Sequence, residues 1–276
     1  MSSSALHPHN FEQESIWTQV ADAYAEAAVP LFSLFANDGI DWLAPSAEMR
    51  ALDVATGPGT AMLPLARSVG RLDAIDFSPK MIEACRQRAA SAAATNVHST
   101  VMDGHALHFA ANTFDVVTSF FGVVHFADAD QGLREMFRVL KPGGRALVSS
   151  WAPPSESGLM GTLLAALAAA IPDLPDGDVV FHHRVDSHRL GERLAASGYR
   201  DVEVRTFTHG AELPSAELLW QSMCRSSVPV VLLRNGCDPA TWEKISRTVV
   251  AHLERRPWPL RTSAAAYLAM GHKPSK

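Results

Sequence analysis

The chain has 276 residues, of which 47% are hydrophobic, and a formal net charge of −5. That length can bury a substantial core, and the negative balance offers no positive surface for polymeric nucleic acid, so we expect no nucleic-acid partner. Three scattered cysteines form neither a disulfide framework nor a CxxC pair, which favours a reducing cytoplasm. The first ten residues are polar, unlike a secretory signal, and no apolar stretch is long enough to span a membrane.

Two helices are predicted before the first strand. Residues 11–28 are rich in alanine, with Val20 and Tyr24 near helical spacing, and Pro30 interrupts the pattern. A second, shorter helix is predicted over residues 31–43. These two helices form the N-terminal part of the chain.

A short apolar strand, predicted over residues 50–55, runs directly into two glycines. Gly57 and Gly59 permit backbone conformations that a Cβ would disfavour, and they let a ligand approach the main chain closely. The helix predicted over residues 60–69 offers unpaired N–H groups at its start. This arrangement indicates a small-molecule cofactor site. The dinucleotide form of the turn needs a glycine or alanine where this chain has Met62, which disfavours a nicotinamide cofactor.

A second strand is predicted over residues 71–76 and ends in an acid. Asp76 lies seventeen residues after Gly59, which is about where a ribose-binding carboxylate should fall. Ser78 and Pro79 then provide the N-cap and first turn of a helix predicted over residues 79–92.

Strands and helices alternate up to residue 151, and the composition changes afterwards. Strands are predicted over 96–102, 114–120 and 145–151, with a helix over 131–140. Beyond this point prolines bracket an apolar helix at 161–171. The remaining predicted elements are a helix at 187–197, a strand at 201–208, helices at 215–228 and 239–255, and a last strand at 264–270.

In this order, the motifs resemble those of the class I S-adenosylmethionine-dependent methyltransferases. The first family motif is an acid followed by a glycine-rich turn, as in residues 52–60. Segments 101–104, 113–120 and 134–144 resemble the later motifs around strands three, four and five. Ala55 stands where many members have a glycine, and alanine there is common in the branch resembling quinone C-methyltransferases.

The resemblance implies an α/β fold: a Rossmann-like, seven-stranded mixed sheet whose last strand is antiparallel, with helices on both faces and a helical cap. We expect one structural domain overall, composed of three segments. They are N-terminal cap helices in residues 1–45, a cofactor-binding core in 46–151, and late strands with inserted cap elements in 152–276.

The resemblance also implies the cofactor, S-adenosyl-L-methionine, with S-adenosyl-L-homocysteine as product. Asp53 and the backbone that follows it would hold the methionine portion, Asp76 the ribose hydroxyls and Asp103 the adenine amino group. A plain turn role for the last two acids is the alternative. The expected cofactor-binding residues are Tyr24, Asp53, Ala55, Gly57, Gly59, Asp76, Phe77, Met81, Asp103, Gly104, Ser119 and Phe120.

The histidines offer less specific signals. His125 follows the fourth strand, beside the expected methyl position, and is the candidate catalytic base, although it could instead pack or donate to the cofactor. His105 and His108 could share one helix turn, but without a third ligand we expect no metal site. His182 and His183 could reach an acceptor pocket or lie on the surface.

The resemblance implies an enzyme that transfers a methyl group by SN2 displacement to oxygen, nitrogen or carbon of a small acceptor. No Asn-Pro-Pro-Tyr or Asp-Pro-Pro-Tyr follows the fourth strand, which disfavours DNA bases and glutamine amides as acceptors. Apolar cap segments 159–167 and 218–223 would suit an apolar or aromatic acceptor, or would simply pack the cap on the core. Trp17 and Tyr24 could close the cofactor pocket as a lid, or pack as an amphipathic helix.

Two other functions stay open at this point, together with a homodimer. One is a protein that binds S-adenosylmethionine without transferring methyl, as a partner subunit or a rearrangement catalyst. The other is an NAD(P)-dependent oxidoreductase, which Met62 disfavours.

Overall fold

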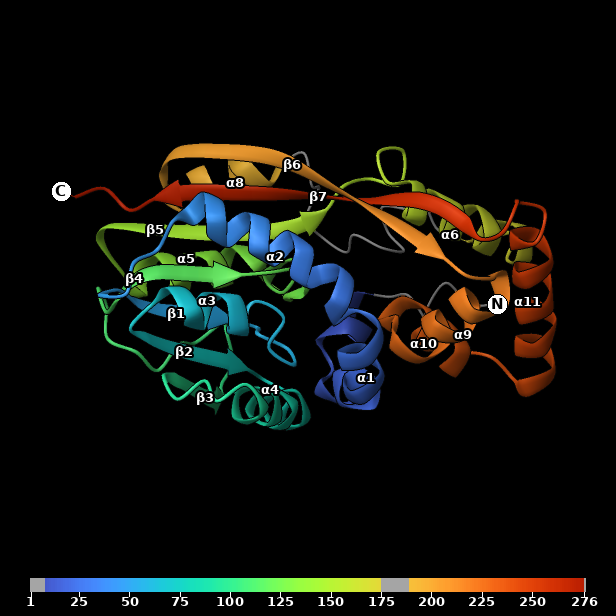
Figure 1. Ribbon diagram of the computed structural model, residues 1–276, viewed down its shortest axis with the longest axis horizontal. Helices are drawn as coiled ribbons and strands as arrows, with labels where there is room; N and C mark the ends of the chain where they lie inside the picture. Colours follow the sequence, from blue (N-terminus) through green and yellow to red (C-terminus); the bar gives the residue numbers. More distant parts are fainter. Residues whose placement is uncertain (1–7, 175–188, 276) are drawn as a thin grey trace.

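The computed structural model describes residues 8–174 and 189–275. Its centre is the predicted seven-stranded sheet, whose strands lie in the order β3-β2-β1-β4-β5-β7-β6 (Figure 1). The strands are β1 Arg50–Val54, β2 Arg71–Asp76, β3 Val97–Val101, β4 Phe114–Ser119, β5 Leu140–Trp151, β6 Arg200–Leu213 and β7 Leu260–His272.

Helices cover both faces of this sheet. Figure 1 shows α2 and α3 in front of it and α5 and α8 behind it. Buried apolar side chains form one large cluster that includes α2, α3 and α4, and a second that includes α5 and α8. The helices are η2 Pro8–Glu12, α1 Glu14–Ala27, α2 Val29–Leu43, α3 Met62–Ser68, α4 Pro79–Ser91, η3 Val123–His125, α5 Ala129–Val139, α6 Gly158–Ala170, α8 Leu190–Ala196, α9 Ala216–Ser226, α10 Val228–Asn235 and α11 Pro239–Leu253.

Local signals in the first half of the chain define these elements closely. β2 has the predicted bounds, and Ser78 caps α4 by accepting a hydrogen bond from the Met81 N–H at 3.4 Å. α3 begins at Met62, later than predicted, so Pro64 falls in its first turn, where its missing N–H costs little. β5 begins earlier than predicted, at Leu140.

Parallel pairing places the ends of three strands together. β1 pairs in parallel with β2 and with β4, so the chain segments that follow these strands emerge at one edge of the sheet. Loops at that carboxyl edge are where open α/β sheets bind ligands. β7 lies between β5 and β6 and is antiparallel to both, which confirms the prediction for the last strand.

The last two strands are longer than predicted and reach beyond the rest of the sheet. β6 and β7 stay paired as far as Leu213 and Leu260, whereas the pairing of β5 with β7 ends at Trp151. The result is a two-stranded ribbon of residues 208–213 and 260–265, which extends toward α9, α10 and α11 in Figure 1.

These three helices and α6 form the cap. In it, Trp220 of α9 stacks on Trp242 of α11 with ring centroids 5.6 Å apart. No helix was predicted over α10, whose first residues include valines and a proline. Burial of most of its side chains, from Val228 to Leu233, stabilises this short helix instead. Within the described residues, no helix is both long and apolar enough to cross a bilayer.

Candidate active site

A cavity of about 410 Å³ lies at the carboxyl edge of β1, β2 and β4, and is called the edge cavity below. Its β1 and β2 side is lined by residues that the sequence singled out. They are Ala55, Gly57, Asp76, Phe77 and Met81.

The other predicted residues divide into two groups. Five more line the edge cavity: Tyr24, Asp103, Gly104, Phe120 and His125. Asp53, Gly59 and Ser119 are not among its lining residues, and each contacts the loops around the cavity instead.

The glycine-rich loop after β1 has an unusual backbone. Ala55, Gly57 and Gly59 have φ angles of 54°, 57° and 84°, in the left-handed region that favours glycine. Arg88 of α4 donates hydrogen bonds from Nη1 to the carbonyl oxygens of Pro58 and Gly59, at 2.8 and 2.9 Å. A Cβ at Gly59 would lie 2.8 Å from the flexible end of the Met62 side chain, so the left-handed backbone rather than this contact is the main reason for glycine here.

Asp53 lies behind the edge cavity. Its two carboxylate oxygens accept hydrogen bonds from the hydroxyls of Thr56 and Thr118, both at 2.7 Å. Burial raises the pKa of Asp53 to about 6, although these two hydrogen bonds act in the opposite direction. Asp53 thus connects β1, the glycine-rich loop and β4.

Asp76 is buried at the end of β2 and faces the edge cavity. It accepts backbone N–H groups of Gly57 and Ser78, each at 2.9 Å, on its two oxygens. Burial raises the pKa of Asp76 to about 6, against the effect of these hydrogen bonds. Because each carboxylate oxygen has a second lone pair, Asp76 can accept two further donors.

Asp103 and Gly104 follow β3 on the opposite wall. Asp103 Oδ1 accepts the His105 backbone N–H at 2.8 Å and also lies 2.8 Å from His105 Nδ1. Partial burial raises the pKa of Asp103, but the hydrogen bonds from His105 outweigh it and hold the pKa below its usual value. A Cβ at Gly104 would lie 2.4 Å from the Phe126 ring, so glycine allows this ring to close against the loop.

His105 therefore contacts Asp103 rather than forming a histidine pair for a metal. Its other ring nitrogen accepts the Asp128 N–H at 3.3 Å. Among the residues that the structure describes, no group of three or more His, Cys, Asp or Glu side chains is arranged to hold a metal ion.

Ser119 shapes the turn after β4. Its hydroxyl accepts the Val123 N–H at 3.0 Å, and Phe121, with a φ of 55°, donates its N–H to Ser149 Oγ at 2.9 Å. A Cβ at Gly122 would lie 2.6 Å from the Ala55 methyl group, so this turn and the glycine-rich loop are in close contact.

The N-terminal segment closes the remaining side of the edge cavity. Phe11, Glu12 and Trp17 line it, although only Trp17 was a predicted lid residue. The His125 ring is close to two of them, with its centroid 6.3 Å from that of Phe11 at an interplanar angle of 10° and 5.2 Å from that of Trp17. No motif indicates Phe11 or Glu12, because their place depends on how the segment folds back over the sheet.

Tyr24 of α1 also reaches the edge cavity. Burial, and after it the charge of Asp76, raises the pKa of the Tyr24 hydroxyl above its usual range, so this group stays protonated. Thr18 of the same helix lies within hydrogen-bond distance of Ser78, with 3.0 Å between the two hydroxyl oxygens. Helix α1 is thereby attached to the loop that follows Asp76.

The charge of the edge cavity restricts what can bind there. Its lining includes the carboxylates Glu12, Asp76 and Asp103, and no lysine or arginine among the described residues. Such a wall fits a neutral diol and a positively charged sulfonium, whereas a pyrophosphate would meet carboxylates without a compensating cation. The residues present therefore fit a nucleoside sulfonium and not a dinucleotide.

The apolar cap residues do not line the edge cavity. Leu163 and Trp220 are buried in the core, and Leu218 is 54% exposed. Of the two interpretations of these segments, the structure favours packing of the cap on the core. His182 and His183 lie outside the described residues.

Comparisons with known proteins identify the family to which the chain is similar. Residues 51–144 match a family described as "Methyltransferase domain". The demethylmenaquinone methyltransferase of Deinococcus radiodurans is 34% identical over 178 residues, which cover 58% of this chain and 71% of that protein.

Two solved structures show the same fold. The YcgJ protein from Bacillus subtilis has a TM-score of 0.57 at 18% identity, covering 89% of this chain and 98% of the other. The Haemonchus contortus phosphoethanolamine N-methyltransferase 2, solved with S-adenosyl-L-methionine, has a TM-score of 0.54 at 16% identity. The match covers 87% of this chain and 52% of the other. Together with the sequence similarity, these findings show that the chain belongs to the class I S-adenosylmethionine-dependent methyltransferases, enzymes that take a methyl group from S-adenosylmethionine.

Proposed function

We propose that the edge cavity binds S-adenosylmethionine with its ribose at Asp76 and its adenine between Phe77 and Asp103. The methionine portion would follow the backbone of Ala55 and Gly57. One observation carries the proposal: the buried carboxylate of Asp76 faces a cavity whose described lining has no fixed cation. An ionised carboxylate is a strong acceptor for two hydroxyl groups and is attracted to a sulfonium.

The bound donor supplies a methyl carbon that carries a sulfonium leaving group. An acceptor electron pair forms the new bond to this carbon, the carbon–sulfur bond breaks, and its electrons remain on sulfur. The protein's own contribution is alignment and exclusion of water, and alignment alone is worth roughly 7 to 11 kcal/mol. The aromatic walls at Phe11, Trp17 and Phe120 would exclude that water.

For the acceptor, we propose a small apolar or aromatic molecule with a quinone-like ring. Two observations support this class. The curated relative from Deinococcus radiodurans is named for a demethylmenaquinone. In this chain, Tyr24 and Phe121 line the edge cavity, and the Phe121 ring packs against Trp151 with centroids 4.5 Å apart.

His125 has two candidate roles that different variants separate. Its ring packs near both Phe11 and Trp17, and we therefore propose that it encloses the cavity. His125→Phe should then keep turnover within about threefold, because the ring contacts remain. A base role requires the opposite: turnover lost, donor affinity kept, and a changed dependence of rate on pH. Rate against pH, measured beside donor calorimetry, distinguishes them.

We also propose that residues 1–45, 46–151 and 152–276 form one structural domain, which works in the cytoplasm. The largest apolar cluster, which includes side chains from Phe11 to Met270, supports a single domain. Three cysteines that are all free support the cytoplasm.

Analytical ultracentrifugation of the purified chain tests whether it forms a homodimer.

The function is tested with donor labelled in its methyl group and a panel of catechols, naphthols and reduced quinones. We expect label in an extracted ring product, with none formed by Asp76→Ala. Label transferred only to amines or carboxylic acids would contradict the acceptor class. Failure of the wild-type chain to bind S-adenosylhomocysteine in calorimetry would contradict the donor site itself.

A further inference from the structure

The β3–β4 loop, residues 102–113, brings Asp103, Gly104 and His105 to the edge cavity. β3 lies at one edge of the sheet, so the loop has strands on one side only. Between its own backbone groups the loop has one hydrogen bond, Ala106 N–H to Asp103 O at 3.2 Å, besides side-chain bonds such as Thr113 hydroxyl to Ala110 O at 2.6 Å. Its conformation must therefore be held from outside.

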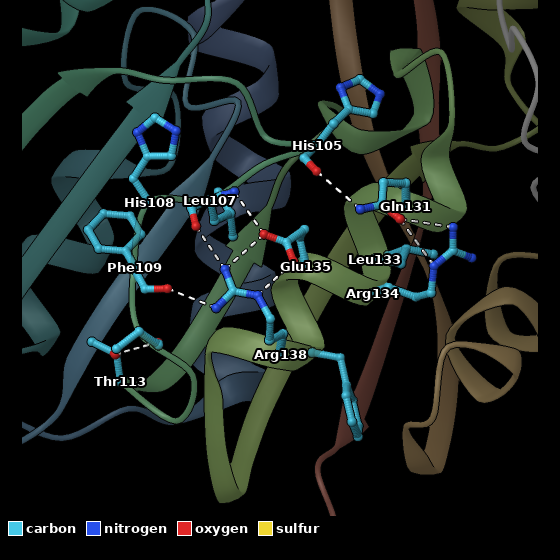
Figure 2. Close-up of polar contacts among 12 residues, drawn as sticks. His105, Leu107, His108, Phe109, Thr113, Gln131, Leu133, Arg134, Glu135 and Arg138 are labelled. Carbon is cyan, nitrogen blue, oxygen red and sulfur yellow. Dashed lines mark hydrogen bonds and ion pairs between the residues drawn. The ribbon is translucent and has the colours of Figure 1, made fainter.

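One face of α5 provides that support. Gln131, Glu135 and Arg138 are spaced at i, i+4 and i+7, which places them on the same side of the helix, and Figure 2 shows them directed at the loop. Glu135 Oε2 accepts the Leu107 N–H at 2.8 Å. Gln131 Nε2 donates to the His105 carbonyl at 3.2 Å.

Arg138 binds the loop at two further points. Its Nη2 donates to the Leu107 carbonyl and its Nη1 to the Phe109 carbonyl, both at 2.8 Å (Figure 2). Main-chain groups of three residues between 105 and 109 are thus bonded to side chains of a single helix. Such bonds from charged groups are shorter and stronger than neutral ones.

Glu135 and Arg138 also fix each other. Arg138 Nε donates to Glu135 Oε1 at 2.6 Å, and Nη2 to Oε2 at 2.8 Å, in a bidentate pair. The hydrogen bonds from Arg138 hold the pKa of Glu135 below its usual value, so the pair stays ionised at neutral pH. Two-point pairing of this kind restricts orientation as well as distance.

We infer that Glu135 and Arg138 are positioning residues for the adenosine end of the donor. They hold the β3–β4 loop so that Asp103, Gly104 and His105 line the edge cavity before the donor binds. A preorganised loop binds more tightly because its ordering cost has been met in folding. This inference rests on the proposed donor site and adds a role for α5, whose side chains do not line the edge cavity.

The test compares Arg138→Met, Glu135→Leu and Glu135→Gln. For the first two, we expect the Kd of S-adenosylhomocysteine to rise on the order of ten- to a hundredfold, since each loses charge-assisted hydrogen bonds to the loop. 5′-Methylthioadenosine, which lacks the amino-acid portion, should lose affinity by the same factor. Turnover at saturating donor should stay within about twofold. Glu135→Gln should recover most of the affinity, because its amide oxygen can still accept the Leu107 N–H.

The matched control is Glu192→Leu. Glu192 pairs with Arg189 at the same i, i+3 spacing and 3.0 Å, but both side chains are largely exposed and the pair does not contact the loop. Donor affinity should be unchanged in this variant. Amide hydrogen exchange of residues 105–109 should be at least about tenfold faster in Arg138→Met and unchanged in the control.

Two results overturn the inference. One is an unchanged Kd for both ligands in folded Arg138→Met and Glu135→Leu; the other is an affinity loss for S-adenosylhomocysteine without one for 5′-methylthioadenosine. If those variants do not fold, Arg138→Lys is the deciding variant, because lysine retains the charge but can reach only one of the two carbonyl groups. Unchanged donor affinity in Arg138→Lys would also overturn the inference. A wild-type chain that binds neither ligand refutes the donor site, which is a different outcome.

Discussion

The strand ends and loops around the edge cavity, called the cavity half, and the cap both contain many buried side chains. Different interactions stabilise each of these two regions. Around the cavity, buried carboxylates such as Asp53 and Asp76 accept hydrogen bonds at distances of 2.7 to 2.9 Å. In the cap, the stacked rings of Trp220 and Trp242 pack against apolar neighbours. Directional bonds specify one geometry, whereas apolar contact mainly contributes stability. Substitutions should therefore affect ligand binding on one side and unfolding on the other.

The largest effect on binding is expected at Asp76. Asp76→Ala removes the acceptor of the proposed ribose bonds, each worth roughly 1.5 to 3 kcal/mol, so donor binding should weaken by about 3 to 6 kcal/mol. Isothermal titration with S-adenosylhomocysteine measures this. Asp73→Ala is the matched control, because Asp73 belongs to the same strand but pairs with Arg50 and Arg71. Equal donor affinity in Asp76→Ala and Asp73→Ala would show that Asp76 has no special role in donor binding.

Trp220→Ala tests the cap in the same way. The ring is buried against Trp242, and its loss should lower the free energy of unfolding by about 3 to 5 kcal/mol. Donor affinity should remain within about twofold. Urea unfolding and titration of the same sample measure both quantities. Trp220→Phe should cost much less, because Nε1 has no hydrogen-bond partner among the described residues. A large loss of affinity in folded Trp220→Ala would show that the cap shapes the donor site.

The pH dependence of the cavity half should have opposite signs for stability and for binding. The pKa of Asp53 and of Asp76 is raised to about 6 from 3.8, so their contribution to stability is fully present below about 3.8 and lost as pH rises through 6. Donor binding requires ionised Asp76, so affinity should increase more than about tenfold between pH 4.5 and 7. Unfolding and titration at both pH values, with Asp76→Asn as the reference that cannot titrate, measure the two slopes. If stability and donor affinity changed with pH in the same direction, the proposed ionisation of Asp76 would be contradicted.

The smallest effect is expected at Ala55, where the chain departs from the common glycine. Its φ of 54° costs about 1 kcal/mol, but its methyl group packs against Gly122. Ala55→Gly should therefore change the free energy of unfolding by less than about 1 kcal/mol. Ala44 has a φ of 47° at the exposed end of α2, and Ala44→Gly should stabilise the chain by about 1 kcal/mol. Equal gains at both sites would show that the Ala55 methyl contributes nothing.

The sequence predicts the cavity half better than the cap for a physical reason. A strand-end acid such as Asp76 and an N-cap such as Ser78 must stand at fixed spacings, so their positions can be read locally. These constraints act over a few residues of chain.

Long-range contacts explain what the sequence did not reveal. Phe11 and Glu12 line the edge cavity only because the N-terminal segment folds over the sheet. α10 is helical because most of its side chains are buried, and the ends of β6 and β7 are strands because they pair with each other beyond β5. The support that Arg138 gives to the β3–β4 loop likewise crosses about thirty residues of chain, as in its bond to the Phe109 carbonyl.

The ribbon formed by β6 and β7 has a practical consequence for engineering. Residues 214–259 leave it at Leu213 and return at Leu260, which are directly opposite partners. Their Cα atoms are therefore separated by about 4.5 to 5.5 Å, a gap that almost any compact insert can bridge. Residues 214–259 can thus be exchanged as a cassette: a replacement that still covers α6 and α1 would leave every strand register of the sheet intact.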